Sequence, residues 1–141
     1  MAQQQMVMLN TRPQDAYRRQ DVLTATATDL IVMLYDALKK NIILGRRGIM
    51  KKDVQAAHTH LMKAQEIVTE LLNSLDMNYQ ISEELLSIYE FMLKNLEDAN
   101  LHKDQEPLAP VIEIVDDLRS AWHEISITSK GSLYISEGQE A

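Results

Sequence analysis

The chain has 141 residues, enough for one domain with its own hydrophobic core, and 45% of them are apolar. Four glycines and three prolines are too few for a β-rich protein of this length, so long helices joined by short loops are favoured. The net charge of −7 argues against a nucleic-acid partner, and the absence of cysteine excludes disulfides and thiolate metal sites.

Residues 1–14 are rich in Gln and Met and show no periodicity, so we expect a flexible N-terminal segment. The segment lacks the charged start and the continuous apolar stretch of a signal peptide, and no apolar run reaches the length of about 18 residues that a membrane-spanning helix needs. We therefore expect a cytoplasmic protein without membrane insertion. Residues 15–23 are expected to form a short helix or turn.

The first long helix is expected to begin near Thr26 or Thr28, with Asp29 in its first turn, and to end at Gly45. Its apolar residues cover more than one stripe, so it should be buried on two sides. The excess needs a cover, which the N-terminal segment, a second subunit or a client helix could supply. The apolar positions are Leu30, Ile31, Met33, Leu34, Tyr35, Ala37, Leu38, Ile42 and Ile43.

A second helix is predicted over about residues 52–74, with the narrow heptad seam of a bundle helix. The seam positions are Val54, Ala57, Leu61, Ala64, Val68, Leu71 and Leu75. The third helix is expected to start with Ser82 as its N-cap, and a polar loop should follow at residues 100–106. Its predicted buried face is Leu85, Tyr89, Met92, Leu96 and Ala99.

The fourth helix should hold Pro107 and Pro110 in its first turn, where proline is tolerated. Its predicted buried positions are Val111, Val115, Leu118, Trp122 and Ile125. The helical pattern is lost after Ser126, so residues 127–141 are expected to form a frayed tail. The four helices predict an all-α domain over residues 15–126, with the antiparallel up-down order of a four-helix bundle.

The chain shows no motif typical of an enzyme, and no cofactor is expected. His58 and His60 point to different faces of one predicted helix, and no histidine follows an acid at the spacing of a di-iron bundle, so metal binding is disfavoured. One alternative remains. His60, with Lys63 three residues later, resembles the helix of histidine phosphotransfer (HPt) proteins, although Gln65 is long where a small residue is expected. We predict that His60 has no catalytic role.

Several short segments follow one another in a specific order: Ala16-Tyr17, Val22–Leu30, Met33–Asp36, Lys63–Leu71, Ser74–Asp76, Tyr89 and Leu118–Trp122. In this order they resemble the signature of the FliS family of flagellin-specific export chaperones, over roughly residues 15–122. Each segment alone is a weak signal, and the ordered set is a strong one. Ala27 and Ala37 depart from the signature, because the family has proline and glycine at these positions.

The resemblance implies a four-helix bundle with a short N-terminal cap segment. It implies a chaperone that binds the disordered C-terminal segment of flagellin in the cytoplasm, prevents its premature polymerisation and keeps it competent for export. The flagellar export apparatus is a second candidate partner, and both a monomer and a homodimer remain open.

The same resemblance implies a set of residues that contact the client. Tyr17 would be the cap residue that fills the client groove, and Val22 belongs to the same apolar N-terminal segment. Five residues would form the floor of the groove: Thr24, Ala25, Leu30, Met33 and Leu34. Gln65 and Glu70 would lie at its polar edge. A position in the ordinary core explains Leu30 and Leu34 equally well.

Overall fold

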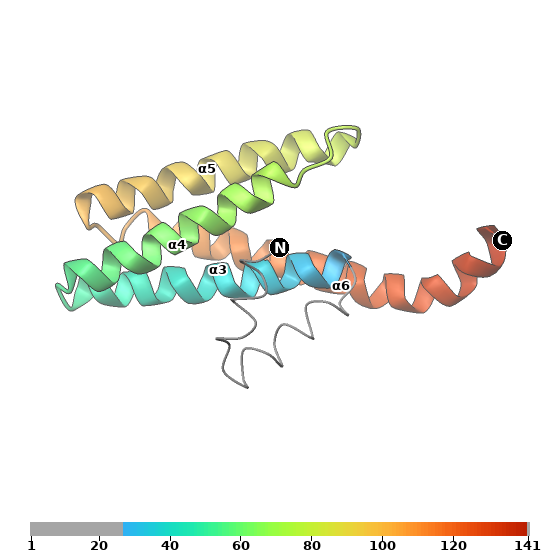
Figure 1. Cartoon of the computed structure of the whole chain (residues 1–141), viewed down its shortest axis with the longest axis horizontal. Helices are drawn as coiled ribbons and strands as arrows, with labels where there is room; N and C mark the ends of the chain where they lie inside the picture. The colour runs from blue at the N-terminus through green and yellow to red at the C-terminus, as the bar shows by residue number, and fades with distance from the viewer. Residues whose placement is uncertain (1–26, 141) are drawn as a thin grey trace, which may run out of the picture.

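The computed structural model describes the backbone of residues 27–140 and the side chains of residues 28–125. Four helices account for most of this part: α3 (Ala27–Met50), α4 (Val54–Asn73), α5 (Gln80–His102) and α6 (Leu108–Glu140). They run alternately in opposite directions, and α6 extends beyond the end of the other three (Figure 1). The predicted all-α, antiparallel four-helix bundle is confirmed, and the described part has no strand. The predicted segments 1–14 and 15–23 lie outside the described residues.

The helix α3 occupies a central position, because it packs on α4 along one side and on α6 along another. This arrangement confirms that α3 is buried on two sides. The helix α5 packs mainly on α4 and has a much smaller contact with α6. The largest fully buried side chains come from all four helices: Tyr35, Leu38, Ile42, Leu61, Val68, Leu71, Met92, Leu96, Leu108, Val111 and Val115.

The prediction that Gly45 ends the first long helix was wrong, because α3 continues to Met50. Gly45 and Gly48 instead lie on the side of α3 that packs tightly against α4. A Cβ atom at Gly45 would lie 2.7 Å from Cδ2 of Leu61, and one at Gly48 would lie 2.7 Å from the backbone nitrogen of Ala57. These glycines therefore serve helix packing and do not terminate the helix.

The turn between α3 and α4 is made by residues with strong local preferences. Lys52 adopts a left-handed conformation with φ of 59°, which ends the helical path. Asp53 follows as the N-cap of α4, where its side chain accepts a hydrogen bond of 3.1 Å from the backbone nitrogen of Ala56. The predicted seam of α4 is buried from Ala57 to Leu71, but Val54 at its start is 60% exposed, and Leu75 is half-buried and lies beyond the end of α4.

The start of α5 differs from the prediction, since the helix begins at Gln80 and Tyr79 occupies the N-cap position. Ser82 is a buried residue of the first turn, and its hydroxyl donates a hydrogen bond to the carbonyl oxygen of Asp76. The predicted buried face of α5 is confirmed at all five positions. The predicted loop began too early, because Asn100 is still helical and the left-handed residue is Lys103.

The helix α6 begins at Leu108, so that Pro110 lies in its first turn and Pro107 directly precedes it. Its backbone is helical through Glu140, and the helix therefore does not end at Ser126 as its pattern indicated. The fraying expected of residues 127–141 stays a prediction. Within the described residues, no helix combines the length and the apolar character of a membrane span.

Candidate functional site

A pocket of about 320 Å³ opens at the end of the bundle where α4 connects to α5, and we call it the α4–α5 pocket. The helix α3 contributes Ile31, α6 contributes Trp122, and the remaining lining residues lie between Leu71 and Tyr89. Two of them, Tyr79 and Ile81, are 64% and 57% exposed. The pocket is therefore an apolar site with large hydrophobic side chains that water can reach.

Local hydrogen bonds hold the connection that forms this side of the pocket. The carboxylate of Asp76 accepts a hydrogen bond of 3.0 Å from the backbone nitrogen of Asn78, which is the geometry of an Asx turn. The carbonyl of the same residue accepts the hydroxyl hydrogen bond of Ser82. Tyr79 and Ile81 lie in the sequence between the two residues that bond to Asp76, namely Asn78 and Ser82, so these hydrogen bonds hold the segment that carries both exposed side chains.

Two tyrosines form a buried hydrogen bond beside the pocket. Tyr89 lines the pocket, and its hydroxyl oxygen lies 2.6 Å from the hydroxyl oxygen of Tyr35. Burial raises the pKa of both tyrosines above the ordinary value. The hydrogen bond with Tyr89 raises the pKa of Tyr35 further, while a hydrogen bond with Trp122 acts in the opposite direction. Both phenols are neutral at physiological pH, so the pair adds polar groups but no charge to this region.

The tyrosine pair predicts a loss of stability at alkaline pH. Below about pH 10 both phenols are protonated in the folded and the unfolded chain, and their contribution is fully present. Above about pH 10 only the unfolded chain releases these protons readily, so the free energy of unfolding should fall by up to about 1.4 kcal/mol per pH unit for each tyrosine. Urea unfolding between about pH 8 and 11 measures this slope. The variant Tyr35→Phe/Tyr89→Phe should show a flatter profile, and an unchanged slope would contradict the assignment.

Segments that are far apart in the sequence meet at the α4–α5 pocket. Leu71 ends one of the signature segments, residues 74–76 form another, and Tyr89 and Trp122 belong to two more. Tyr35, from the segment Met33–Asp36, joins them through its hydrogen bond to Tyr89. Leu71, Tyr89 and Trp122 were predicted as buried helix positions and as parts of the signature, but not as site residues. The feature of the sequence that could have identified them is their apolar and aromatic character.

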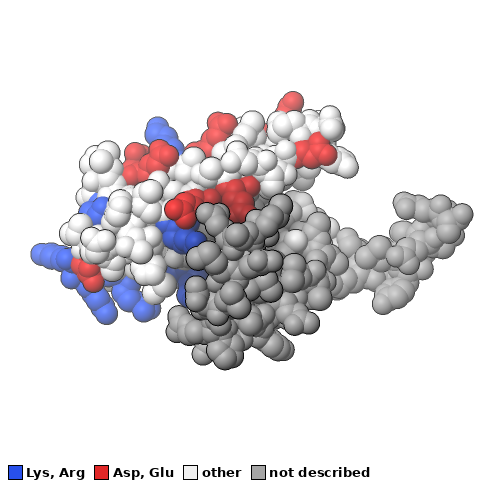
Figure 2. Space-filling view, viewed as in Figure 1, with Lys and Arg blue, Asp and Glu red and all other residues white. Residues whose placement is uncertain are grey.

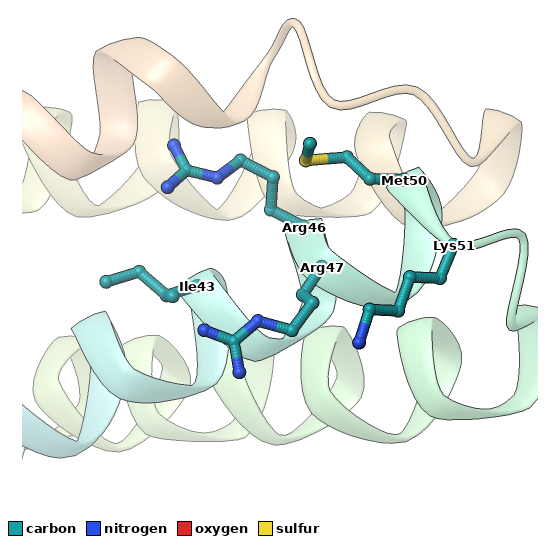
Figure 3. Close-up of a pocket in the computed structure, with 5 residues that line it drawn as sticks. All are labelled: Ile43, Arg46, Arg47, Met50 and Lys51. Carbon is teal, nitrogen blue, oxygen red and sulfur yellow. The ribbon is translucent and has the colours of Figure 1, made fainter.

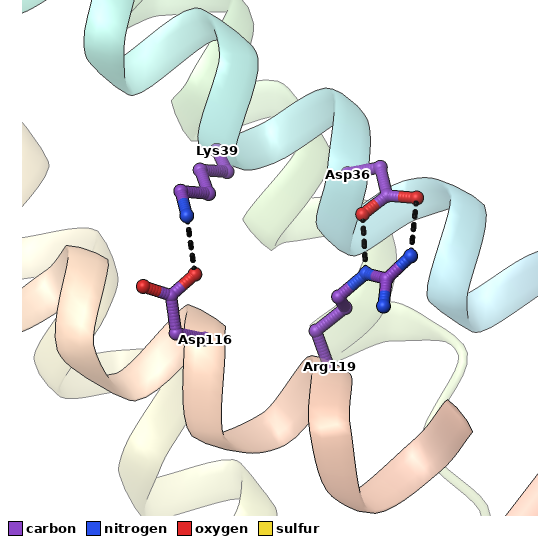
Figure 4. A network of polar contacts seen from close by, with 4 residues as sticks. All are labelled: Asp36, Lys39, Asp116 and Arg119. Atoms are coloured by element: carbon purple, nitrogen blue, oxygen red, sulfur yellow. Dashed lines mark hydrogen bonds and ion pairs between the residues drawn. The ribbon is translucent and has the colours of Figure 1, made fainter. Parts of the chain in front are cut away.

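Two ion pairs join α3 to the part of α6 that precedes Trp122 in the sequence (Figure 4). Nε of Arg119 lies 2.7 Å from Oδ1 of Asp36, and Nζ of Lys39 lies 2.7 Å from Oδ1 of Asp116. The hydrogen bond with Asp36 raises the pKa of Arg119. Exposed pairs of this kind contribute about 0–1 kcal/mol each, so their main effect is to set the register of α6 along α3.

The structure describes five of the nine predicted client contacts, since Tyr17, Val22, Thr24 and Ala25 lie outside the described residues. The other five residues do not line the α4–α5 pocket. Leu30, Met33 and Leu34 are half-buried neighbours on α3, of which Leu34 packs against the core. Gln65 is half-buried and Glu70 exposed, and their spacing turns them about 140° apart around α4. The structure therefore groups the three α3 residues but not the two α4 residues.

The histidines on α4 take part in contacts between helices. Nδ1 of His60 lies 3.2 Å from Oδ1 of Asn41 on α3, and Nδ1 of His58 lies 3.2 Å from Nδ2 of Asn100 on α5. His60 is half-buried, whereas a phosphotransfer histidine must be open to its partner domain. The hydrogen bond to Asn41 gives His60 a role in helix packing.

Comparison with known proteins identifies the family. Residues 8–129 match the family model described as flagellar protein FliS. The chain is 36% identical to the flagellar secretion chaperone FliS of Bacillus subtilis over 110 residues, which are 78% of this chain and 83% of the relative. It is 30% identical to the chaperones of the same name from Vibrio cholerae and Salmonella typhimurium, over 78% and 74% of this chain and 85% and 80% of the relatives. These matches do not favour the phosphotransfer alternative at His60. The chain therefore belongs to the FliS family of flagellar secretion chaperones.

Proposed function

We propose that this flagellar secretion chaperone binds the disordered C-terminal segment of flagellin in the cytoplasm, prevents its premature polymerisation and keeps it competent for export. The observation that supports the proposal most strongly is the convergence of the signature segments at the α4–α5 pocket. Residues from all four helices line one apolar pocket, and its exposed Tyr79 and Ile81 have no structural need to be apolar.

The pocket dimensions indicate how the client binds. A volume of about 320 Å³ lies at the lower end of the range for ligand pockets, so it can take one or two apolar side chains but not a whole helix. The rest of the client helix would lie across Tyr79 and Ile81. This is helix-in-groove recognition, in which a disordered segment folds as it binds.

The predicted contacts of the N-terminal half extend the same proposal. Leu30 and Met33 are half-buried on α3, and Leu30 is the sequence neighbour of the pocket residue Ile31. A client helix that leaves the pocket could continue along this part of α3. Leu34, Gln65 and Glu70, with Tyr17, Val22, Thr24 and Ala25 before α3, remain proposed contacts of the same segment.

A calorimetric titration tests the proposed function. A synthetic peptide with the C-terminal segment of the flagellin from the same organism should bind with one peptide per chaperone. Binding should have a negative heat-capacity change, because apolar surface is buried, and the peptide should gain helical circular dichroism. A peptide of scrambled sequence is the control for non-specific association. The absence of heat and of helix gain, with a folded chaperone, would contradict the proposal.

A further inference from the structure

A second surface feature lies on the last turns of α3, at the other end of the helix from the α4–α5 pocket. It is a hollow of about 190 Å³ lined by Ile43, Arg46, Arg47, Met50 and Lys51, and we call it the basic hollow. Figure 3 shows the side chains of Ile43, Arg46, Arg47 and Met50 on the last turns of α3 and that of Lys51 directly after the helix. The helical rise separates Ile31 from Met50 by roughly 28 Å, so the two sites are distinct.

No ion pair within the described residues 28–125 neutralises the cations of the basic hollow. The ion pairs between side chains of residues 28–125 join Lys39 to Asp116, Arg119 to Asp36 and Lys63 to Glu66, so none involves a cation of the hollow. Lys52, next in the chain, adds a further exposed cation. Figure 2 shows most Lys and Arg of this face at the end of the bundle where α3 meets α4, whereas Asp and Glu are concentrated along α5 and in the middle of the face. Although the net charge of the chain is −7, the described part of the bundle thus has a basic end.

The hollow also has an apolar component. Met50 is 64% exposed and Ile43 is half-buried, and both lie among the cations. Methionine is flexible and polarizable, and it adapts to side chains of different shape. A purely electrostatic contact would not need these two residues. The combination of an apolar floor and flanking guanidinium groups therefore suits a ligand that has an apolar side chain next to negative charge.

We propose that the basic hollow binds an acidic segment of a partner protein. One apolar side chain of this segment enters the hollow against Ile43 and Met50, and carboxylates on either side of it pair with Arg46 and Arg47. Guanidinium groups form short, bidentate hydrogen bonds with carboxylates, so the contact depends on the orientation of the carboxylate as well as on its charge. The site extends beyond the proposed function, and it does not depend on flagellin binding at the α4–α5 pocket.

The observations favour a peptide over other polyanions. Nucleic acid and anionic membranes meet a broad surface, and the net charge of −7 opposes their approach to the molecule as a whole. The hollow has no aromatic side chain on which a base could stack. Its volume matches a single side chain, and its cations lie close together, at the end of α3 and directly after it. A short acidic peptide carries little total charge and contacts only the hollow, so the net charge of the protein opposes it less than an extended polyanion.

Fluorescence anisotropy with the full-length protein tests the proposal. The probe is a labelled peptide with a central leucine flanked by glutamates. Arg46→Gln/Arg47→Gln should weaken its binding about tenfold or more, because two charge-assisted contacts are lost. Lys63→Gln/Lys94→Gln removes the same charge from exposed positions elsewhere and should change the affinity less than about twofold. Replacing the central leucine of the peptide by serine, or Met50 by glutamine, should also weaken binding.

Four outcomes would overturn the proposal. Equal losses in the two double variants would show non-specific attraction, and indifference to the central leucine would show that the apolar floor has no role. Tighter binding of poly(U) RNA or of phosphatidylglycerol vesicles than of the peptide would assign the hollow to another class of partner. The flagellin peptide should bind Arg46→Gln/Arg47→Gln normally, and a loss would make the hollow part of the client site. Circular dichroism verifies that each variant is folded.

Discussion

Gly48→Ala should destabilise the bundle by about 2 kcal/mol and lower its melting temperature by roughly 5–10 °C. The added Cβ atom would lie 2.7 Å from the backbone nitrogen and 3.0 Å from the Cα atom of Ala57. Backbone atoms of a packed helix cannot rotate away, so α3 and α4 must move apart along their contact. The higher helix propensity of alanine offsets up to about 1 kcal/mol of this cost. Urea and thermal unfolding, followed by circular dichroism, measure the change.

Gly45→Ala is the variant with which the stability loss of Gly48→Ala should be compared. There the new Cβ atom would meet the Cδ2 and Cγ atoms of Leu61 at 2.7 and 2.8 Å, while the nearest backbone atom is 3.5 Å away. The Leu61 side chain can shift at a smaller cost than a helix backbone, so the loss should be smaller than for Gly48→Ala. Lys40→Ala, at an exposed position of the same helix, should stay within about 0.5 kcal/mol of the wild type. Wild-type stability of Gly48→Ala would contradict the close-packing explanation.

The helices and most of their buried positions could be predicted, because apolar spacing reports burial, but Val54 and Ile125 were predicted to be buried and are 60% and 45% exposed. The face of α5 from Leu85 to Ala99 is buried as predicted. The boundaries were less predictable, because they depend on contacts that spacing does not encode. Gly45 has the local character of a helix end, yet tertiary packing against Leu61 determines its role. Ser82 likewise has the character of an N-cap but is used to close the preceding turn.

The site was less predictable than the fold. The sequence identified α3 as the helix with excess apolar surface, and Leu30 and Met33 are indeed half-buried there. It could not identify the α4–α5 pocket, because Ile31, Tyr79 and Trp122 are adjacent only after four helices have packed. Pocket residues and core residues recur at the same helical spacing in the sequence, so the spacing cannot distinguish them. Only the exposed fractions of Tyr79 and Ile81 distinguish them, and exposure is a property of the folded chain.

Ile81→Asp should weaken binding of the flagellin peptide by about tenfold or more, which corresponds to about 1.4 kcal/mol. Ile81 lines the α4–α5 pocket, and a carboxylate there would have to lose its water when an apolar client side chain enters. The fold should be unaffected, because Ile81 is 57% exposed and lies in the first turn of α5, where a negative charge is favourable. The loss should therefore appear in the affinity and not in the melting temperature.

Leu101→Asp is the matched control for Ile81→Asp. Leu101 is a second aliphatic residue of α5, is 77% exposed and does not line the pocket. The new charge lies near the helix C-terminus and should cost about 0.3–1 kcal/mol of stability, but the peptide should bind as to the wild type. Tyr79→Ala, which removes the exposed ring beside Ile81, should weaken binding as Ile81→Asp does. Calorimetry of the three variants distinguishes the possible locations. If Leu101→Asp loses the peptide while Ile81→Asp retains it, the client binds at the opposite end of α5, and the α4–α5 pocket has another role.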